Sequence, residues 1–260
     1  MIEGIRKGNS DKFIWKHNDV DHLEYLLKNS NKNHPKIVAF ESVYSMDGDF
    51  APIEKIIEVS KKYNALTYLD EVHGVGLYGK NGGGLSEKLG LTSEIDIIEG
   101  TLAKGFGLMG GYIAAKYNII DVIRSFAPGF IFTTSLPPSL AAAAVASIRY
   151  VKNNHSLREA LYERANKLKK LMLAHNLPII KNNSHIVPLL VKDPVRCKEI
   201  SDILLNDYSI YVQPINYPTV PKGLERLRFT PTPLHDDSKL EFLVNALDKI
   251  WRELKLARAA

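Results

Sequence analysis

Apolar residues follow two alternating patterns along the first half of the chain. Short apolar runs of strand length lie at 36–40, at 67–70, at 95–99 and at 110–115. Apolar residues three and four positions apart predict amphipathic helices at 19–27, at 52–63 and at 121–126. Strands that alternate with helices predict an α/β fold with a largely parallel sheet.

The second half of the chain begins with an alanine-rich segment. Residues 139–151 predict a long helix, whose first turn is fixed by Pro137 and Pro138. Beyond it the pattern predicts strands at 186–191, 210–212 and 226–229, and helices at 157–174, 195–206 and 236–256. We therefore expect a large domain over 1–150 and a small α+β domain over 151–260.

Lys104 lies in a polar, glycine-rich segment that follows the apolar run 95–99. An amine attacks an aldehyde only when it is unprotonated, so a Schiff-base lysine needs partial burial or a neighbouring cation to lower its pKa. Flanking glycines let a cofactor approach the backbone, and the hydroxyl of Thr101 can reach a phosphate. Lys104 is the candidate nucleophile, and the alternative is a surface lysine on a glycine-rich turn.

Asp70 ends an apolar run, which places its carboxylate at the carboxyl end of a strand, where open α/β sheets bind ligands. A carboxylate there can pair with the pyridinium nitrogen of pyridoxal 5′-phosphate and maintain the ring as an electron sink. His73 can face the same ring. Alone, Asp-x-x-His is more typical of a surface turn or half a metal site, but together with Lys104 it forms a much narrower pattern.

Five stretches of the chain carry a resemblance to a known family. They are Ser45–Asp49, Asp70–Gly79, Gly100–Lys104, Gly110–Ala114 and Phe130–Pro138. In this order they resemble the 5-aminolevulinate synthases, in the α-oxoamine synthase branch of the fold-type-I pyridoxal-phosphate enzymes. The resemblance implies an aspartate-aminotransferase-like fold and an acyltransferase that condenses glycine with succinyl-coenzyme A. The products are 5-aminolevulinate, coenzyme A and carbon dioxide, in haem and tetrapyrrole biosynthesis; the alternative is a related α-oxoamine synthase or aminotransferase.

The resemblance also implies roles for individual residues. Lys104 binds the cofactor and moves the α-proton, Asp70 pairs with the ring nitrogen, and His73 and Ser45 approach the ring. Thr101 is a further cofactor contact. The alternative for Ser45 is a loop serine bonded to the backbone.

Three further positions match residues that contact the phosphate or the substrate in the family. Thr133 and Thr134 would reach the cofactor phosphate of the other subunit, which implies a homodimer with shared sites; the alternative is two β-branched residues at a strand end. Arg228 matches the arginine that holds the substrate carboxylate, and Thr219 lies in a segment that resembles the active-site lid. Strand alternation puts Arg226 on the face of Arg228, with surface exposure as its alternative.

The family sequences begin earlier than this chain. About a third of their length would precede Met1, including a ring-stacking histidine, a phosphate-binding turn and contacts to the succinyl group. The resemblance thus implies a truncated large domain that lacks its N-terminal strands. We consider a split enzyme completed by a separate N-terminal fragment, a non-catalytic remnant or binding subunit, and a weaker pyridoxal-phosphate enzyme that works alone.

The composition limits which classes of ligand and which cellular location we expect. The formal charge is +5, but basic residues are scattered among acidic ones, so we expect no nucleic-acid binding, while anionic ligands such as coenzyme A suit this surface. The lone Cys197 excludes an internal disulfide and suits a reducing compartment. No apolar run approaches the roughly 20 residues of a membrane span, so we expect a cytoplasmic protein. His185 and His235 have no metal-ligand spacing, and no metal is expected.

Overall fold

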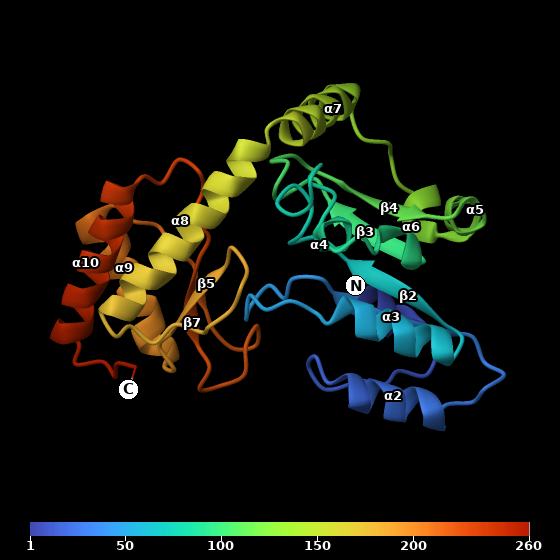
Figure 1. Ribbon diagram of the computed structural model, residues 1–260, viewed down its shortest axis with the longest axis horizontal. Coiled ribbons are helices and arrows are strands. Elements are labelled where there is room, and N and C mark those ends of the chain that lie inside the picture. Colours follow the sequence, from blue (N-terminus) through green and yellow to red (C-terminus); the bar gives the residue numbers. More distant parts are fainter. Residues whose placement is uncertain (260) are drawn as a thin grey trace. The chain divides into compact units, whose positions relative to one another are not determined.

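The computed structural model describes residues 1–259, which form two compact units (Figure 1). The first unit comprises Met1–Val43 and Ala51–Asn153. The second comprises the loop Tyr44–Phe50 and the residues from Asn154 onward. The loop therefore belongs to the second unit, although its sequence lies between two elements of the first.

The first unit holds a four-stranded sheet and its helices. Its strands are β1 (Lys36–Glu41), β2 (Ala65–Asp70), β3 (Ile97–Thr101) and β4 (Gly111–Ala115). Its helices are α1 (Ile2–Lys7), α2 (Val20–Asn29), α3 (Ile53–Lys62), α4 (Leu85–Lys88), the 3-10 helix η1 (Thr92–Glu94), α5 (Tyr117–Phe126), α6 (Pro128–Ile131) and α7 (Pro138–Asn153). The helices predicted near 19–27, 52–63, 121–126 and 139–151 are confirmed.

The strand order in this sheet is β1-β2-β3-β4. The first three strands are parallel, which confirms the predicted largely parallel sheet, and β4 runs antiparallel to β3. Asp70 is the register partner of both Glu41 on β1 and Glu99 on β3. The carboxyl ends of three strands therefore meet at the edge that carries Asp70.

One face of this sheet is covered by helices. α3 packs on β2, and α2 packs on α3 (Figure 1). Along β2, residues 65, 67 and 69 are buried, whereas Leu66 is 42% exposed. Because side chains alternate along a strand, Tyr68 and Asp70 share the more open face with Leu66. The candidate carboxylate thus lies on the side opposite α3.

β3 begins two residues later than the apolar run 95–99 predicts. The Asp96 carboxylate accepts hydrogen bonds from the amide and the hydroxyl of Thr67, at 2.9 and 3.0 Å. A side chain therefore takes the place of a ladder bond, and pairing with β2 starts only at Ile97. At the other end, pairing with Gly111 on β4 makes Thr101 the last residue of the strand and not part of the following loop.

The second unit packs three long helices on a small antiparallel sheet. The helices are α8 (His155–Ala174), α9 (Pro194–Tyr208) and α10 (Asp237–Glu253). The strands are β5 (Val187–Leu190), β6 (Pro214–Ile215) and β7 (Arg226–Phe229), in the order β5-β7-β6. Met172, Leu227 and Trp251 are almost fully buried in one continuous core. The predicted helices and two of the three predicted strands are confirmed here.

The strand predicted at 210–212 is wrong. The Val212 side chain is buried, but its carbonyl accepts a hydrogen bond from the Ser201 hydroxyl at 2.6 Å, and the Ile210 amide donates to Leu204. Both bonds go to α9, so this apolar segment packs as an irregular connection. The third strand is β6, which begins at Pro214.

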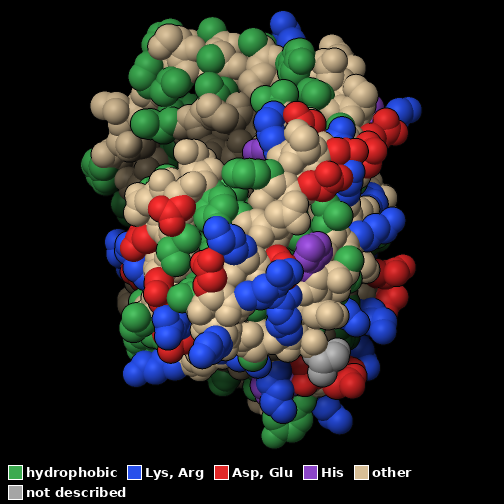
Figure 2. Space-filling model, turned by 90° about the vertical axis from the view of Figure 1, so that its left-hand side faces the viewer, with side chains coloured by type: hydrophobic (Ala, Val, Ile, Leu, Met, Phe, Trp, Pro, Cys, Tyr) green, Lys and Arg blue, Asp and Glu red, His purple; other side chains and the backbone are tan. Residues whose placement is uncertain are grey.

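The molecular surface carries charges of both signs. On the face seen in Figure 2, basic and acidic side chains are interspersed. None of the helices within residues 1–259 is long and apolar enough to cross a membrane.

Candidate active site

Asp70 is half-buried at the end of β2. Its Oδ1 accepts a hydrogen bond from the Val72 amide at 2.8 Å, which fixes the carboxylate at the start of the following turn. Burial raises the pKa of Asp70 and the Glu99 carboxylate adds to this rise, whereas the Val72 amide and the Lys104 ammonium oppose it. Asp70 and Lys104 therefore lie within electrostatic reach of each other, at the carboxyl edge of the sheet.

The loop that carries Lys104 touches the turn that carries His73. A Cβ atom on Gly105 would lie 2.7 Å from the carbonyl oxygen of Val75. Gly76, which follows Val75 in sequence, has a φ of +80°, and a Cβ atom there would lie 3.2 Å from the Cα atom of Gly105. Only glycine combines such a positive φ with so close a backbone approach. The two glycines thus bring the segments after β2 and β3 together.

The expected partial burial of Lys104 is not observed, because its side chain is exposed. The loop is anchored by Leu102, which is 7% exposed, and by a hydrogen bond at 2.8 Å from the Ser147 hydroxyl to the Phe106 carbonyl. These contacts fix the backbone on both sides of the lysine and leave its side chain accessible to a ligand.

Glu71 organises the turn between Asp70 and His73. Its buried carboxylate accepts hydrogen bonds from the Ser42 hydroxyl at 2.5 Å, from the Leu85 amide at 3.1 Å and from the Ser86 amide at 2.7 Å. A buried carboxylate requires such donors, since desolvation of the charge is otherwise costly. Glu71 thereby ties the half-buried His73 turn to the end of β1 and to the first turn of α4.

Thr101 has its hydroxyl engaged within the loop. The Oγ1 atom donates to the Gly110 carbonyl at 3.2 Å and accepts from the Ala103 amide at 3.1 Å. A hydroxyl has one proton to donate. Contact between Thr101 and a phosphate would therefore require this proton to leave Gly110.

Thr133 and Thr134 lie between α6 and α7 and are exposed. The alternative that they end a strand is wrong, because α6 begins at Pro128 and regular structure stops after Ile131. Phe132, immediately before them, is 86% exposed. The two threonines thus sit on an accessible apolar segment.

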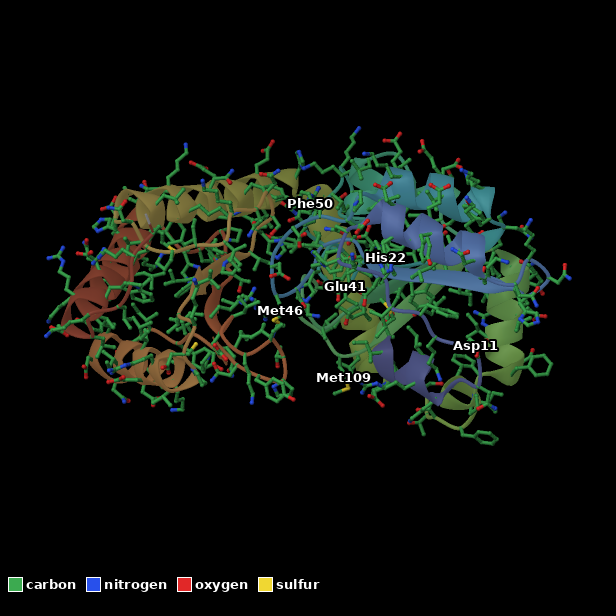
Figure 3. All side chains as sticks on the ribbon, turned by 90° about the horizontal axis from the view of Figure 1, so that it is seen from below. Asp11, His22, Glu41, Met46, Phe50 and Met109 are labelled. Carbon is green, nitrogen blue, oxygen red and sulfur yellow. The ribbon has the colours of Figure 1, made fainter. Side chains whose placement is uncertain are left out.

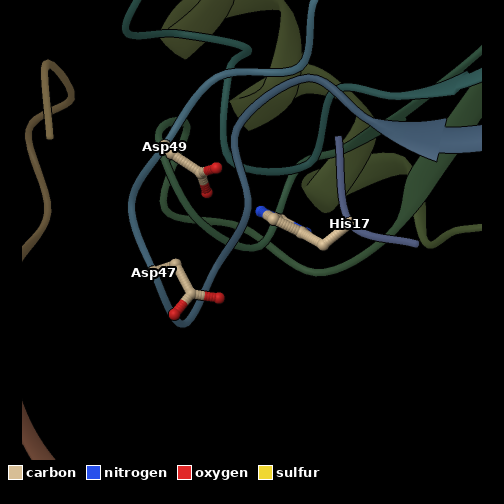
Figure 4. A group of neighbouring side chains, drawn as sticks. All are labelled: His17, Asp47 and Asp49. Carbon is tan, nitrogen blue, oxygen red and sulfur yellow. The ribbon is translucent and has the colours of Figure 1, made fainter. Parts of the chain in front are cut away.

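Ser45 lies on the loop Tyr44–Phe50, which Met46 and Phe50 mark in Figure 3 and Asp47 and Asp49 mark in Figure 4. Its carbonyl accepts a hydrogen bond from Arg228 Nη1 at 3.1 Å. The structure therefore brings together Ser45 and Arg228, two residues that the resemblance implies as ring and substrate contacts. Burial lowers the pKa of Arg228 from its ordinary value.

Arg226 is not a surface residue, because its side chain is only 2% exposed. Its Nη1 donates to the Met46 carbonyl at 3.0 Å and to Asp47 Oδ1 at 2.8 Å, and its Nε donates to the Leu224 carbonyl. The shared face with Arg228 is as predicted, but it faces the loop Tyr44–Phe50 and not solvent.

Thr219 lies in the exposed segment between β6 and β7, where its amide donates to the Asn216 carbonyl at 2.9 Å. The following Val220 is buried. The segment is thus anchored after Thr219, while the threonine itself is accessible.

Several residues that organise the candidate site are difficult to identify from the sequence alone. Glu71 stands within the Asp-x-x-His stretch but has no distinctive spacing of its own. Asn182 donates to the Asp47 carbonyl across 135 positions of sequence. For Arg226, the signal available was its alternation with Arg228, combined with the acidic loop around Asp47.

Over its whole length the chain is similar to proteins named 5-aminolevulinate synthase. The chain is 55% identical over 259 residues to 5-aminolevulinate synthase 1 of Cereibacter sphaeroides, covering 100% of this chain and 64% of that protein. It is 54% identical over 261 residues to the 5-aminolevulinate synthase of Paracoccus denitrificans, again covering 64% of the relative. The resemblance is confirmed, and the chain spans slightly less than two thirds of these relatives.

Solved structures agree on the fold. A serine palmitoyltransferase variant from S. paucimobilis with bound pyridoxal phosphate and myriocin is 31% identical, with a TM-score of 0.93 over 98% of this chain and 64% of that one. An 8-amino-7-oxononanoate synthase from Francisella tularensis, at 23% identity and a TM-score of 0.82, shows the fold alone. The predicted fold-type-I transferase fold is confirmed. Since the model of the aminotransferase class I and II family also matches residues 2–247, the chain belongs to that family.

Proposed function

We propose that this chain carries the lysine-bearing part of a pyridoxal-phosphate enzyme that condenses glycine with succinyl-coenzyme A. The products are 5-aminolevulinate, coenzyme A and carbon dioxide, as an early step of haem biosynthesis. The observation that carries the proposal is that Asp70 and Lys104 follow one another at the carboxyl edge of the sheet, close enough for the Lys104 charge to lower the pKa of Asp70. It gains weight from the 55% identity to a 5-aminolevulinate synthase.

The residues of the first unit fit this cofactor. Pyridoxal phosphate presents a pyridine nitrogen, which needs an acidic partner, and an aldehyde, which needs an amine. Asp70 offers a half-buried carboxylate whose orientation is fixed by the Val72 amide, and Lys104 offers an accessible amine on an anchored loop. Their charges act on each other, so both groups lie in one neighbourhood.

In the proposed reaction each residue has a distinct task. When bound, the cofactor supplies an electron sink for the negative charge that develops at the substrate Cα. Asp70 holds a proton at the pyridine nitrogen by ion pairing. Lys104 takes the proton from Cα of glycine and later returns one to the product, as a general base and then a general acid.

The remaining residues bind and orient. Arg228 holds the glycine carboxylate, for which a guanidinium offers two parallel donors. Thr219 contacts the substrate, and His73 and Ser45 contact the cofactor ring. Thr101 is a cofactor contact only if its hydroxyl releases Gly110.

We also propose a homodimer in which Thr133 and Thr134 reach the phosphate bound by the partner subunit. The segment around them is apolar and accessible: Phe126 is 75% exposed, Phe130 56% and Phe132 86%. Large apolar side chains exposed this close together in sequence favour an interaction site. A second copy of the chain would cover it.

The first test is chemical labelling. The purified chain is mixed with pyridoxal phosphate, reduced with borohydride, digested and mapped by mass spectrometry. We expect the pyridoxyl mass at Lys104, retained in Lys116→Ala and lost in Lys104→Ala. Labels spread evenly over the surface lysines would contradict the proposal.

A second arm addresses substrate and completeness. Labelling is repeated with the remaining N-terminal segment of a relative supplied in trans, because a separate N-terminal polypeptide is the further partner we propose. Glycine and L-serine are then compared as ligands of whichever preparation takes up the label at Lys104. Serine is included because a serine palmitoyltransferase is among the similar structures. A response to serine alone would redirect the proposal to a sister enzyme.

A further inference from the structure

The loop Tyr44–Phe50 is held by a clamp of three side chains from elsewhere in the second unit. Three successive carbonyls each accept one donor. Ser45 accepts from Arg228 at 3.1 Å, Met46 from Arg226 at 3.0 Å and Asp47 from Asn182 Nδ2 at 3.0 Å. Two of these donors come from β7, and Asn182 comes from the segment before β5.

Asn182 is itself held in one orientation. Its Oδ1 accepts from Lys169 Nζ at 2.9 Å and from the Ser184 amide at 3.1 Å. An amide side chain has its acceptor and its donor on opposite branches. With the oxygen committed to these donors, Nδ2 must point the other way, toward the Asp47 carbonyl.

Lys169, which holds Asn182 Oδ1, is a buried lysine that bonds to uncharged acceptors. It is 8% exposed, and its ammonium bonds to the Asn182 carbonyl and to the Ser184 carbonyl besides Asn182 Oδ1. All three acceptors are uncharged, and burial lowers the pKa of Lys169 to about 8. The three hydrogen bonds offset part of the cost of burying this cation, and they hold residues 182–184 in one conformation.

Two backbone hydrogen bonds close the loop on itself. The Gly48 amide donates to the Tyr44 carbonyl at 2.8 Å, and the Tyr44 amide donates to the Asp49 carbonyl at 3.0 Å. Gly48 has a φ of +74°, and a Cβ atom there would lie 2.7 Å from Asn182 Nδ2. The loop thus rests directly on Asn182, and the clamp joins it to β7 at Ser45 and Met46.

We propose that Asn182 is a positioning residue for the substrate-carboxylate site. By holding the Asp47 carbonyl it fixes the loop, and the loop fixes the Arg228 guanidinium through the Ser45 carbonyl. The inference rests on the proposed function, in which Arg228 binds the carboxylate of glycine.

The test compares Asn182→Asp with Asn183→Asp in the full chain. The first variant keeps the size of the side chain and an oxygen for Lys169, but it replaces the donor facing the Asp47 carbonyl with an oxygen. The second makes the same charge change at the next residue, which is exposed. The control accounts for the added negative charge. The remaining difference combines the lost Nδ2 bonds to the Asp47 and Ile180 carbonyls with the stronger pairing of the new carboxylate with Lys169, and only the lost bond to Asp47 loosens the loop Tyr44–Phe50.

Two readouts are needed. In amide hydrogen exchange, we expect the Tyr44 and Gly48 amides to exchange roughly fivefold faster in Asn182→Asp than in Asn183→Asp, because one hydrogen bond contributes about 1 kcal/mol. In a glycine titration of the pyridoxal-phosphate-loaded chain, followed by cofactor absorbance, we expect affinity to fall roughly tenfold in Asn182→Asp only.

The readouts separate this inference from the proposed function. If the unsubstituted chain does not respond to glycine, the proposed function fails, and hydrogen exchange alone still decides the clamp. Equal exchange in the two variants overturns the clamp. Faster exchange with unchanged glycine affinity overturns the positioning role.

Discussion

Two segments that the sequence predicts as ligand contacts differ in how they are held. The loop Tyr44–Phe50 receives side-chain donors at three successive carbonyls, one of them from the buried Arg226. Over residues 128–137, which carry Thr133 and Thr134, every residue is exposed. The first segment is thus preorganised by this chain, whereas the second is exposed along its whole length.

The largest expected effect comes from removing the central donor of the clamp. Arg226→Met leaves the Met46 and Leu224 carbonyls without their donor and Asp47 without its ion pair. Since Asp47 is partly exposed, we expect a loss of about 3 kcal/mol in the free energy of unfolding, at the lower end for a broken buried pair. Urea denaturation measures it.

Arg196→Met is the matched control. Arg196 pairs with Glu199 at 2.6 Å on an exposed helix surface. We expect no measurable change in the free energy of unfolding, because exposed ion pairs are screened by solvent. Equal losses in the two variants would show that the clamp contributes no more than a surface ion pair.

The surroundings of Arg228 should also make stability depend on pH. Burial, with Lys169 and Arg228 nearby, lowers the pKa of His185 from 6.5 to about 4. Below pH 6.5 the unfolded chain binds a proton that the folded chain does not bind until about pH 4. This stability is therefore present above pH 6.5 and is lost as the pH falls, by roughly 2 kcal/mol at pH 5.

Denaturation curves at pH 7.5 and pH 5 for His185→Gln and His235→Gln test this expectation. His235 is exposed. The pH dependence should flatten in His185→Gln and persist in His235→Gln. An unchanged pH dependence in the first variant would mean that His185 is not kept neutral by its surroundings.

A smaller effect is expected at the edge that carries Asp70. The Tyr68 hydroxyl donates to Glu99 Oε2 at 2.7 Å, on the open face of the sheet. Tyr68→Phe removes this donor from a half-buried carboxylate and should cost about 1 kcal/mol of unfolding free energy. Tyr25→Phe, at a side chain that is 63% exposed, should cost nothing measurable, and equal costs would speak against the bond.

The smallest effect on folding is expected in the exposed segment. Phe132→Asp changes a side chain that is 86% exposed, so the unfolding free energy should change by less than about 0.5 kcal/mol. Association should nevertheless weaken, because a charge would enter the proposed dimer surface. Sedimentation velocity measures this, with Leu234→Asp, at an 82% exposed position in the second unit, as the control. A dimer that persists in Phe132→Asp would place the interface elsewhere.

Much of the fold could be predicted because burial repeats with the period of each element. Ile53, Ile56 and Ile57 mark α3 in this way, and all three are buried. The errors occur where side chains replace backbone pairing. Asp96 delays β3, and Ser201 captures the carbonyl of Val212. Hydrophobic patterning does not record either event.

The candidate site divides in the same way. Asp70 and Lys104 could be singled out because the first ends a strand and the second closely follows one, and strand ends converge at one edge of a parallel sheet. The clamp could not be predicted, since Arg226 reaches Met46 across 180 positions of sequence. The exposure of Lys104 was also missed, because burial of a loop residue depends on what packs over it.

The most direct test of the account is formation of 5-aminolevulinate from glycine and succinyl-coenzyme A, with pyridoxal phosphate and the N-terminal segment of a relative supplied in trans. The account predicts product with the unsubstituted chain and with Lys116→Ala, and none with Lys104→Ala. Product that persists in Lys104→Ala, or its absence from a complex that carries the label at Lys104, would contradict the proposed function.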